Sequence, residues 1–130
     1  MDKNLLIIGG IVVVALAVIV AGVYFTGGFG KSSPIVVPNV SGIIFFYGDT
    51  CPHCKNVEDF IKANNIDKKV KYAMLEVFHD QNNAALLLQK AQICGINQNQ
   101  LGVPLVWDGK KCYMGEPDVT NFFKAQAGIK

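Results

Sequence analysis

Residues 43–54 read Ile-Ile-Phe-Phe-Tyr-Gly-Asp-Thr-Cys-Pro-His-Cys, and this stretch decides the fold. Its first five residues form a continuous apolar and aromatic run, which predicts a strand buried on both faces of a sheet. Residues 48–50 end the strand, and Pro52 then stands where the first residue of a helix is expected. The first cysteine of a Cys-x-x-Cys pair therefore lies where a strand gives way to a helix.

The sequence that follows alternates between strand and helix signals up to the carboxyl terminus. An Asp108-Gly109 pair between two apolar runs predicts a hairpin. The right-handed crossover rule makes the first two strands parallel. The sequence therefore predicts an α/β fold of order βαβαββα, with a four-stranded mixed sheet and helices on both faces. The expected further elements are strands over residues 70–78, 105–107 and 111–114, a helix over 84–94 with capping candidates at 80–83, and a helix opened by Pro117.

The amino-terminal quarter of the chain differs in composition from the rest. Residues 5–25 carry no charge, and at about 1.5 Å per residue this run spans a hydrocarbon core of roughly 30 Å. The run is longer than the apolar part of a secretory signal and lacks a clear cleavage site, so we expect one uncleaved transmembrane helix, with a cleaved signal as the alternative. We divide the chain into a membrane anchor (1–31), a linker (32–41) and a folded domain (42–130). The positive-inside count slightly favours a domain outside the cytoplasm.

Charge and composition exclude other classes of protein. All twelve basic residues are lysines, and the net charge is only +2. Without a basic excess or a guanidinium for bidentate phosphate contacts, we expect no nucleic-acid partner. Apolar residues recur along the whole folded segment, which excludes disorder.

The pair Cys51 and Cys54 suggests thiol–disulfide exchange. The thiolate is the reactive form, and a cysteine with the ordinary pKa of about 8.5 supplies little of it at neutral pH. Cys51 lies at a helix amino terminus, where unpaired N–H groups and the helix dipole favour an anion. His53 can donate a hydrogen bond or carry positive charge beside the sulfur. We therefore expect Cys51 as the exposed nucleophile and Cys54 as the more buried resolving thiol.

The remaining cysteines, Cys94 and Cys112, leave alternatives open. We favour two free cysteines that act as small buried hydrophobic residues, with a second disulfide as the alternative. A zinc site that adds this pair or His79 to Cys51 and Cys54 is less favoured, because structural zinc usually takes its second pair from close-spaced ligands. We expect no metal and no organic cofactor, and we interpret His79 as a surface or capping residue.

Residues 45–54, together with Gly102-Val103-Pro104, resemble the thioredoxin superfamily. The Cys-Pro-His-Cys form resembles that of DsbA-type disulfide oxidases, whereas the short span before Pro104 is closer to glutaredoxins. The resemblance implies a thioredoxin-like fold and thiol–disulfide oxidoreductase activity. It also implies a cis peptide bond before Pro104, which faces the active disulfide, and a backbone at Val103 that binds substrate peptide.

Two further positions bear on this resemblance. Residues 115–118, Gly-Glu-Pro-Asp, are similar to the glycine and acid pattern with which glutaredoxins hold glutathione. Phe45 stands where thioredoxins and DsbA-type oxidases have a buried acid that moves the proton of the resolving thiol. Proton transfer from Cys54 then needs water or another group, such as Lys55 or Glu58.

The sequence thus predicts a membrane-anchored, single-pass thiol–disulfide oxidoreductase, an oxidase of extracytoplasmic proteins. The expected partners are cysteine-containing protein substrates, a membrane redox partner that restores the active site, and lipid around the amino-terminal helix. The alternatives are a thioredoxin-like or glutaredoxin-like reductase or electron relay, and a metal-binding or metal-handing module that uses the same two thiols. The expected site residues are Cys51, Cys54, His53 and Pro52 for catalysis, with Val103 and Pro104 for substrate binding.

Overall fold

The computed structural model describes residues 34–130, so the predicted membrane anchor lies outside the described residues. Within this range the strands and the α-helices follow the predicted order βαβαββα. No helix of residues 34–130 combines the length and the apolar character needed to cross a membrane. The elements are β1 (Ile43–Tyr47), α2 (Pro52–Ala63), the 3-10 helix η1 (Ile66–Lys68), β2 (Tyr72–Glu76), α3 (Gln81–Ile93), the 3-10 helix η2 (Gln98–Gln100), β3 (Leu105–Trp107), β4 (Cys112–Met114) and α4 (Glu116–Gln126).

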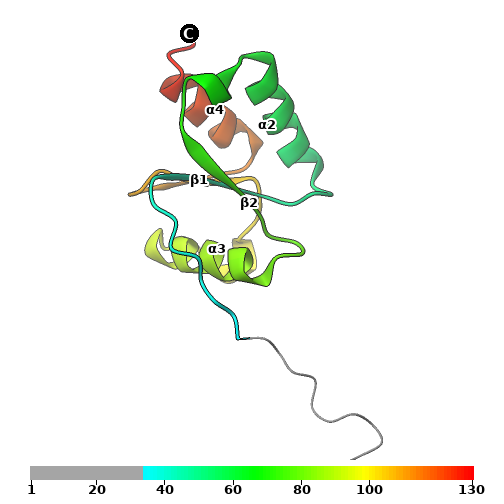
Figure 1. Cartoon of the computed structure of the whole chain (residues 1–130), viewed down its shortest axis with the longest axis vertical. Coiled ribbons are helices and arrows are strands. Elements are labelled where there is room, and N and C mark those ends of the chain that lie inside the picture. The colour runs from blue at the N-terminus through cyan, green and yellow to red at the C-terminus, as the bar shows by residue number, and fades with distance from the viewer. Residues whose placement is uncertain (1–33) are drawn as a thin grey trace, which may run out of the picture. The chain divides into compact units, whose positions relative to one another are not determined.

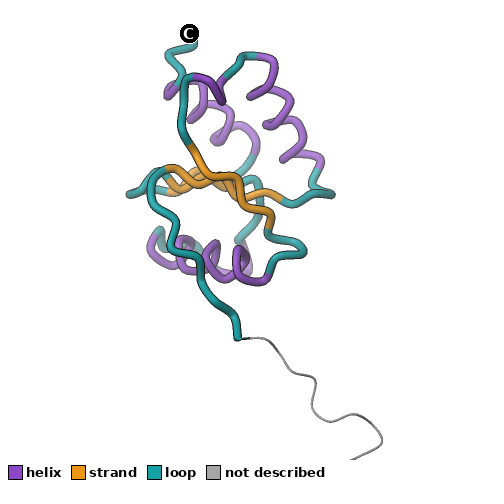
Figure 2. The backbone as a smooth tube through the Cα atoms, viewed as in Figure 1, coloured by secondary structure: helices purple, strands orange, loops and turns teal. Residues whose placement is uncertain are grey.

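The four strands form one mixed sheet in the order β2-β1-β3-β4, drawn in orange in Figure 2. β1 pairs with β2 in parallel, and β3 is antiparallel to both β1 and β4. The β3–β4 hairpin turns at Gly109, whose φ of 101° is a backbone conformation that glycine adopts without steric cost. The carboxylate of Asp108 accepts the backbone N–H groups of Lys110 and Lys111 at 2.7 Å each and fixes this turn. The predicted topology is confirmed.

Helices cover both faces of the sheet, with α2 and α4 on one side and α3 on the other (Figure 1). The side chains of β1 alternate between these two layers, as the pleat of a strand requires. Phe45 packs in a cluster with Val57 of α2 and Phe123 of α4, whereas Ile44 and Phe46 pack with leucines of α3. These three central side chains of β1 have no exposed surface. The unbroken apolar run of β1 follows from burial on both faces, as predicted.

Several element boundaries differ by one to three residues from the predicted ones, and two of them differ because side chains cap the backbone there. β2 ends at Glu76, before the predicted end at residue 78, because the Glu76 carboxylate accepts the N–H groups of Phe78 and His79 at 2.7 and 2.9 Å. α3 begins at Gln81, not at residue 84, because Asp80 is the residue that caps it. The carboxylate of Asp80 accepts two backbone N–H groups of the first turn, a standard way to start a helix.

Candidate active site

Cys51 and Cys54 form a disulfide at the first turn of α2, with their Cα atoms 5.2 Å apart. Cys51 is the residue that caps the helix, its backbone is extended, and Pro52 follows as the first helical residue. Cys51 is partly exposed, whereas Cys54 has no exposed surface. Cys51 therefore carries the sulfur that a partner molecule can reach.

The backbone around Cys51 holds its sulfur at the positive end of the helix. The N–H of Cys54 donates to Sγ of Cys51 at 3.2 Å. The N–H of Cys51 donates to the carbonyl of Gly48, and the carbonyl of Cys51 accepts the N–H of Lys55, both at 3.1 Å. Because free N–H groups and the helix dipole meet at this end, negative charge on the Cys51 sulfur is favoured there.

The loop that contains Val103 and Pro104 lies against the same sulfur. The Val103–Pro104 peptide bond is cis, as the resemblance implied, and the Val103 carbonyl oxygen lies 3.6 Å from Sγ of Cys51. The Pro104 carbonyl accepts the N–H of Gly115 at 2.8 Å, which ties this loop to the start of α4. Within residues 34–130 the N–H of Val103 has no hydrogen-bond acceptor. A main-chain donor therefore stands free beside the disulfide.

Glu116, the first residue of α4, belongs to the site. The sequence pointed to it only within residues 115–118, through their similarity to a glutathione-holding pattern, and its contact with His53 was not predicted. Its Oε2 atom lies 2.8 Å from Nδ1 of His53 and accepts a hydrogen bond from the Asn56 amide at 3.0 Å. The hydrogen bonds from His53 and Asn56 lower the pKa of Glu116. The imidazole of His53 is thus held by a carboxylate of α4, in place of the hydrogen bond to sulfur that the sequence suggested.

The surroundings of Cys54 contain no buried acid. Phe45 is fully buried at the position of the missing carboxylate, and no polar or charged residue of the described range is buried. Lys55 instead pairs with Asp59 on the exposed face of α2, and this hydrogen bond raises the pKa of Lys55. Glu58 lines a hollow of about 220 Å³ together with Tyr72. The described residues therefore offer no buried side chain that could take the role of this acid toward Cys54.

The second pair, Cys94 and Cys112, forms a disulfide with a Cα–Cα distance of 6.0 Å. The prediction of two free cysteines is therefore wrong, and the alternative is correct. Cys94 ends α3 and Cys112 begins β4, and both side chains are partly buried. The sheet order, which puts β4 beyond β3, and the packing of α3 on the sheet bring these two residues together. The pairing also removes them as zinc ligands that would complete a set with Cys51 and Cys54.

No protein-family model and no curated protein matches this chain. Among solved structures, a mutant of the thioredoxin-like protein BC3987 is 21% identical, with a TM-score of 0.51 over 70% of this chain and 100% of that chain. The buckwheat glutaredoxin–glutathione complex is 17% identical, with a TM-score of 0.45, and covers 68% of this chain and 82% of that one. A glutaredoxin from Archaeoglobus fulgidus is 19% identical, with a TM-score of 0.45, over 71% and 96% of the two chains.

The likeness to the thioredoxin-like protein, which covers 70% of this chain, shows the fold. The chain has a thioredoxin-like α/β fold with a four-stranded mixed sheet. At the start of its helix α2 this fold carries a vicinal cysteine pair.

Proposed function

We propose that this chain is a membrane-anchored thiol–disulfide oxidoreductase that introduces disulfides into extracytoplasmic proteins. The observation that carries this proposal is the setting of Cys51. Its sulfur is partly exposed, accepts an N–H at the amino terminus of α2, and lies beside a free main-chain donor at Val103. These are the requirements for a reactive sulfur and for a peptide bound next to it.

The exchange proceeds in two steps through a mixed disulfide. A substrate thiolate attacks Sγ of Cys51, the Cys51–Cys54 bond breaks, and Cys54 leaves as a thiolate that takes a proton from water. A second substrate thiolate then attacks the substrate sulfur of the mixed disulfide, and Cys51 leaves as a thiolate. The substrate loses two electrons and gains a disulfide, and the Cys51–Cys54 pair is reduced to a dithiol.

The direction of this exchange depends on how well the protein holds the Cys51 thiolate. A stabilised thiolate stabilises the reduced protein, which makes the disulfide form a stronger oxidant. The N–H of Cys54 and the dipole of α2 act in this direction. His53 adds positive charge when it is protonated, although its pairing with Glu116 offsets part of that charge.

An apolar groove of about 300 Å³ next to Val103 supports a protein substrate. Phe78 on its rim is 53% exposed, and Leu88 is 37% exposed. A Cβ placed on Gly48 would overlap the Phe78 ring, so this ring lies directly against the turn that leads into Cys51. An extended segment that pairs with Val103 can therefore place an apolar side chain in this groove. The groove is lined by Val77, Phe78, Ala84, Leu87, Leu88, Gln98, Leu101, Gly102 and Val103.

The second disulfide supports a location outside the cytoplasm. Disulfides such as Cys94–Cys112 persist in oxidising compartments and are rare where thiols are kept reduced. A chain anchored by residues 5–25 would then present its domain to proteins that leave the cytoplasm. A redox partner in the same membrane would reoxidise the dithiol, and shared anchoring would raise its effective concentration.

A glutaredoxin-like reductase is the second candidate, and a hollow next to His53 and Pro104 favours it. This hollow has a volume of about 470 Å³, room for a small thiol peptide such as glutathione. It is lined by His53, Val103, Pro104, Gly115, Glu116 and Pro117. In this case glutathione would reduce the Cys51–Cys54 pair, and Cys51 would attack substrate disulfides.

Equilibration with glutathione separates the two candidates. The full-length chain in mild detergent is incubated with mixtures of reduced and oxidised glutathione, and the redox state of Cys51 and Cys54 is read by alkylation and mass spectrometry. An oxidase is expected to remain a dithiol until the buffer is far more oxidising than the cytosolic glutathione poise. If the pair already forms a disulfide in buffers whose reduction potential is near that of thioredoxin, about −270 mV, the result would contradict the oxidase and support the reductase.

A further inference from the structure

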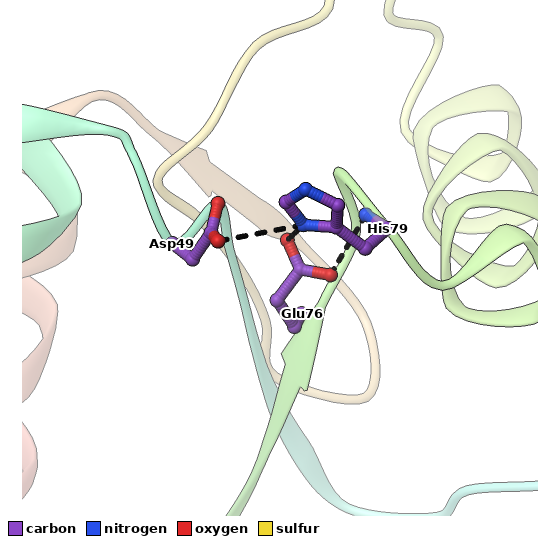
Figure 3. A group of neighbouring side chains, drawn as sticks. All are labelled: Asp49, Glu76 and His79. Carbon is purple, nitrogen blue, oxygen red and sulfur yellow. Dashed lines mark hydrogen bonds and ion pairs between the residues drawn. The ribbon is translucent and has the colours of Figure 1, made fainter.

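Three metal-ligating side chains converge beside the active-site turn, outside the chemistry described above. Asp49 follows β1, Glu76 ends β2, and His79 lies in the turn before α3 (Figure 3). One atom from each, two carboxylate oxygens and an imidazole nitrogen, lie within 4.8 Å of one another. Figure 3 shows one nitrogen of the His79 imidazole facing both the Asp49 and the Glu76 carboxylates.

The distances between the ligand atoms of the three side chains suit coordination of one metal ion. Nδ1 of His79 lies 3.4 Å from Oδ2 of Asp49 and 3.7 Å from Oε1 of Glu76. Ligands at about 2.0–2.1 Å from a tetrahedral metal are roughly 3.3 Å apart, so only small side-chain movements would bring all three onto one ion. The three residues come from segments that the parallel β1–β2 pairing fixes next to each other.

One of the three ligands is already held in place by the backbone. Oε2 of Glu76 accepts the N–H groups of His79 and Asp80 at 2.9 and 3.3 Å, and Oε1 accepts that of Phe78 at 2.7 Å. A carboxylate oriented in this way loses little freedom when it binds an ion, as outer-shell hydrogen bonds do in metal sites. Glu76 is also the least exposed of the three, with 20% of its side-chain surface accessible.

We propose that Asp49, Glu76 and His79 form a binding site for a divalent transition-metal ion of the zinc type. One imidazole nitrogen and two carboxylate oxygens are donors that such ions accept, whereas calcium and magnesium prefer oxygen alone. Three protein ligands leave a fourth position open to water. The His79 and Asp49 side chains are 71% and 49% exposed, so the ion can enter from solvent. The site is independent of the proposed oxidoreductase function.

Zinc titration of the oxidised full-length chain tests this site. With both disulfides closed, none of the four cysteines offers a thiolate ligand. Isothermal titration with ZnCl2 is expected to show one ion bound per chain, and CoCl2 is expected to give visible absorption bands of a low-symmetry site. Asp49→Asn and His79→Gln, which keep the size of each side chain, are each expected to weaken zinc binding at least about 10-fold.

The matched control is His53→Gln, because His53 and His79 are the only histidines in the chain. This variant is expected to bind zinc as tightly as the unmodified chain, and thermal melts establish that all variants are folded. Binding no tighter than about 1 mM would overturn the proposal. Equal affinity of the unmodified chain, Asp49→Asn and His79→Gln would also overturn it, and the cluster would then be an ion pair that joins two turns.

Discussion

The two disulfides of this domain lie at opposite ends of helices. Cys51 caps the amino terminus of α2, whereas Cys94 ends α3 at its carboxyl terminus. Sγ of Cys51 accepts an N–H at 3.2 Å, while Sγ of Cys112 lies 3.6 Å from the carbonyl oxygen of Lys90 in the last turn of α3. The helix dipole stabilises an anion at the first end and destabilises one at the second.

The two pairs also close loops of different length. Cys51 and Cys54 are three positions apart within one helical turn, while Cys94 and Cys112 are 18 positions apart and join α3 to the edge strand β4. A longer closed loop restricts the unfolded chain more strongly. The Cys51–Cys54 disulfide is therefore suited to redox exchange, and the Cys94–Cys112 disulfide to stabilising the fold.

The largest expected effect is on disulfide-exchange activity when cysteines of either pair are replaced by serine. Cys51→Ser is expected to lower disulfide-exchange activity by at least about 100-fold, because the attacked sulfur is removed. The double variant Cys94→Ser/Cys112→Ser is expected to retain most of the activity at a temperature where it is folded. A fluorogenic peptide with two cysteines measures both. Equal losses in the two variants would show that the pairs do not differ in role.

The free energy of unfolding is expected to depend more on the Cys94–Cys112 pair than on the Cys51–Cys54 pair. Cys94→Ala/Cys112→Ala is expected to lose about 3 kcal/mol of unfolding free energy, because its loop is the longer one. Cys51→Ala/Cys54→Ala is expected to lose less, since its loop spans one turn. Chemical denaturation of the full-length chain in detergent, followed by tryptophan fluorescence, measures both. A larger loss at the Cys51–Cys54 pair would contradict this assignment.

The charges of His53 and Glu116 are expected to change the redox equilibrium of the Cys51–Cys54 pair. His53→Ala is expected to shift the equilibrium with glutathione about 10-fold toward the disulfide form, because positive charge near the Cys51 thiolate is lost. Glu116→Gln removes a nearby negative charge and is expected to give a smaller shift toward the dithiol. Alkylation gels across glutathione mixtures measure both shifts. Shifts of the same sign would exclude an electrostatic role for this pair.

The smallest expected effect is the pH dependence of stability that the Glu116 contact between α2 and α4 contributes. Hydrogen bonds from His53 and Asn56 lower the pKa of Glu116 below the ordinary glutamate value of 4.5 in the folded state. Such a carboxylate stabilises the fold above pH 4.5, and this contribution is lost as the pH falls through the lowered folded pKa. The difference in melting temperature between the unmodified chain and Glu116→Gln should shrink over this acid range. A difference that is constant with pH would show that the ion pair adds no stability.

The parts of the fold that depend on a few neighbouring residues were predicted from the sequence. Contacts between residues far apart in the sequence were not. The apolar run of β1, Pro52 after Cys51, and the Asp108-Gly109 turn each act over a few residues, and all three were confirmed. The Cys94–Cys112 disulfide and the Glu116–His53 contact join residues 18 and 63 positions apart. Such pairs follow from sheet order and helix packing, which hydrophobic periodicity does not encode.

Helix and strand ends were the other source of error. Asp80 and Glu76 cap backbone N–H groups through their carboxylates, and this ended β2 and started α3 earlier than predicted. A run of several polar residues offers more than one capping candidate, so the sequence alone does not select among them. The three-residue cluster beside Cys51 was missed for the same reason as the long-range pairs, since Asp49 and His79 meet only once β1 and β2 are paired.

Site-resolved alkylation measures whether the amino terminus of α2 holds Cys51 as a thiolate. The fully reduced chain is exposed to iodoacetamide from pH 4 to pH 10, and mass spectrometry follows each cysteine separately. Cys51 is expected to react half-maximally well below the ordinary cysteine value of about 8.5, and Cys94 and Cys112 at or above it. If Cys51 follows the same pH profile as Cys94 and Cys112, the amino terminus of α2 does not hold a thiolate and the proposed activity has no chemical basis.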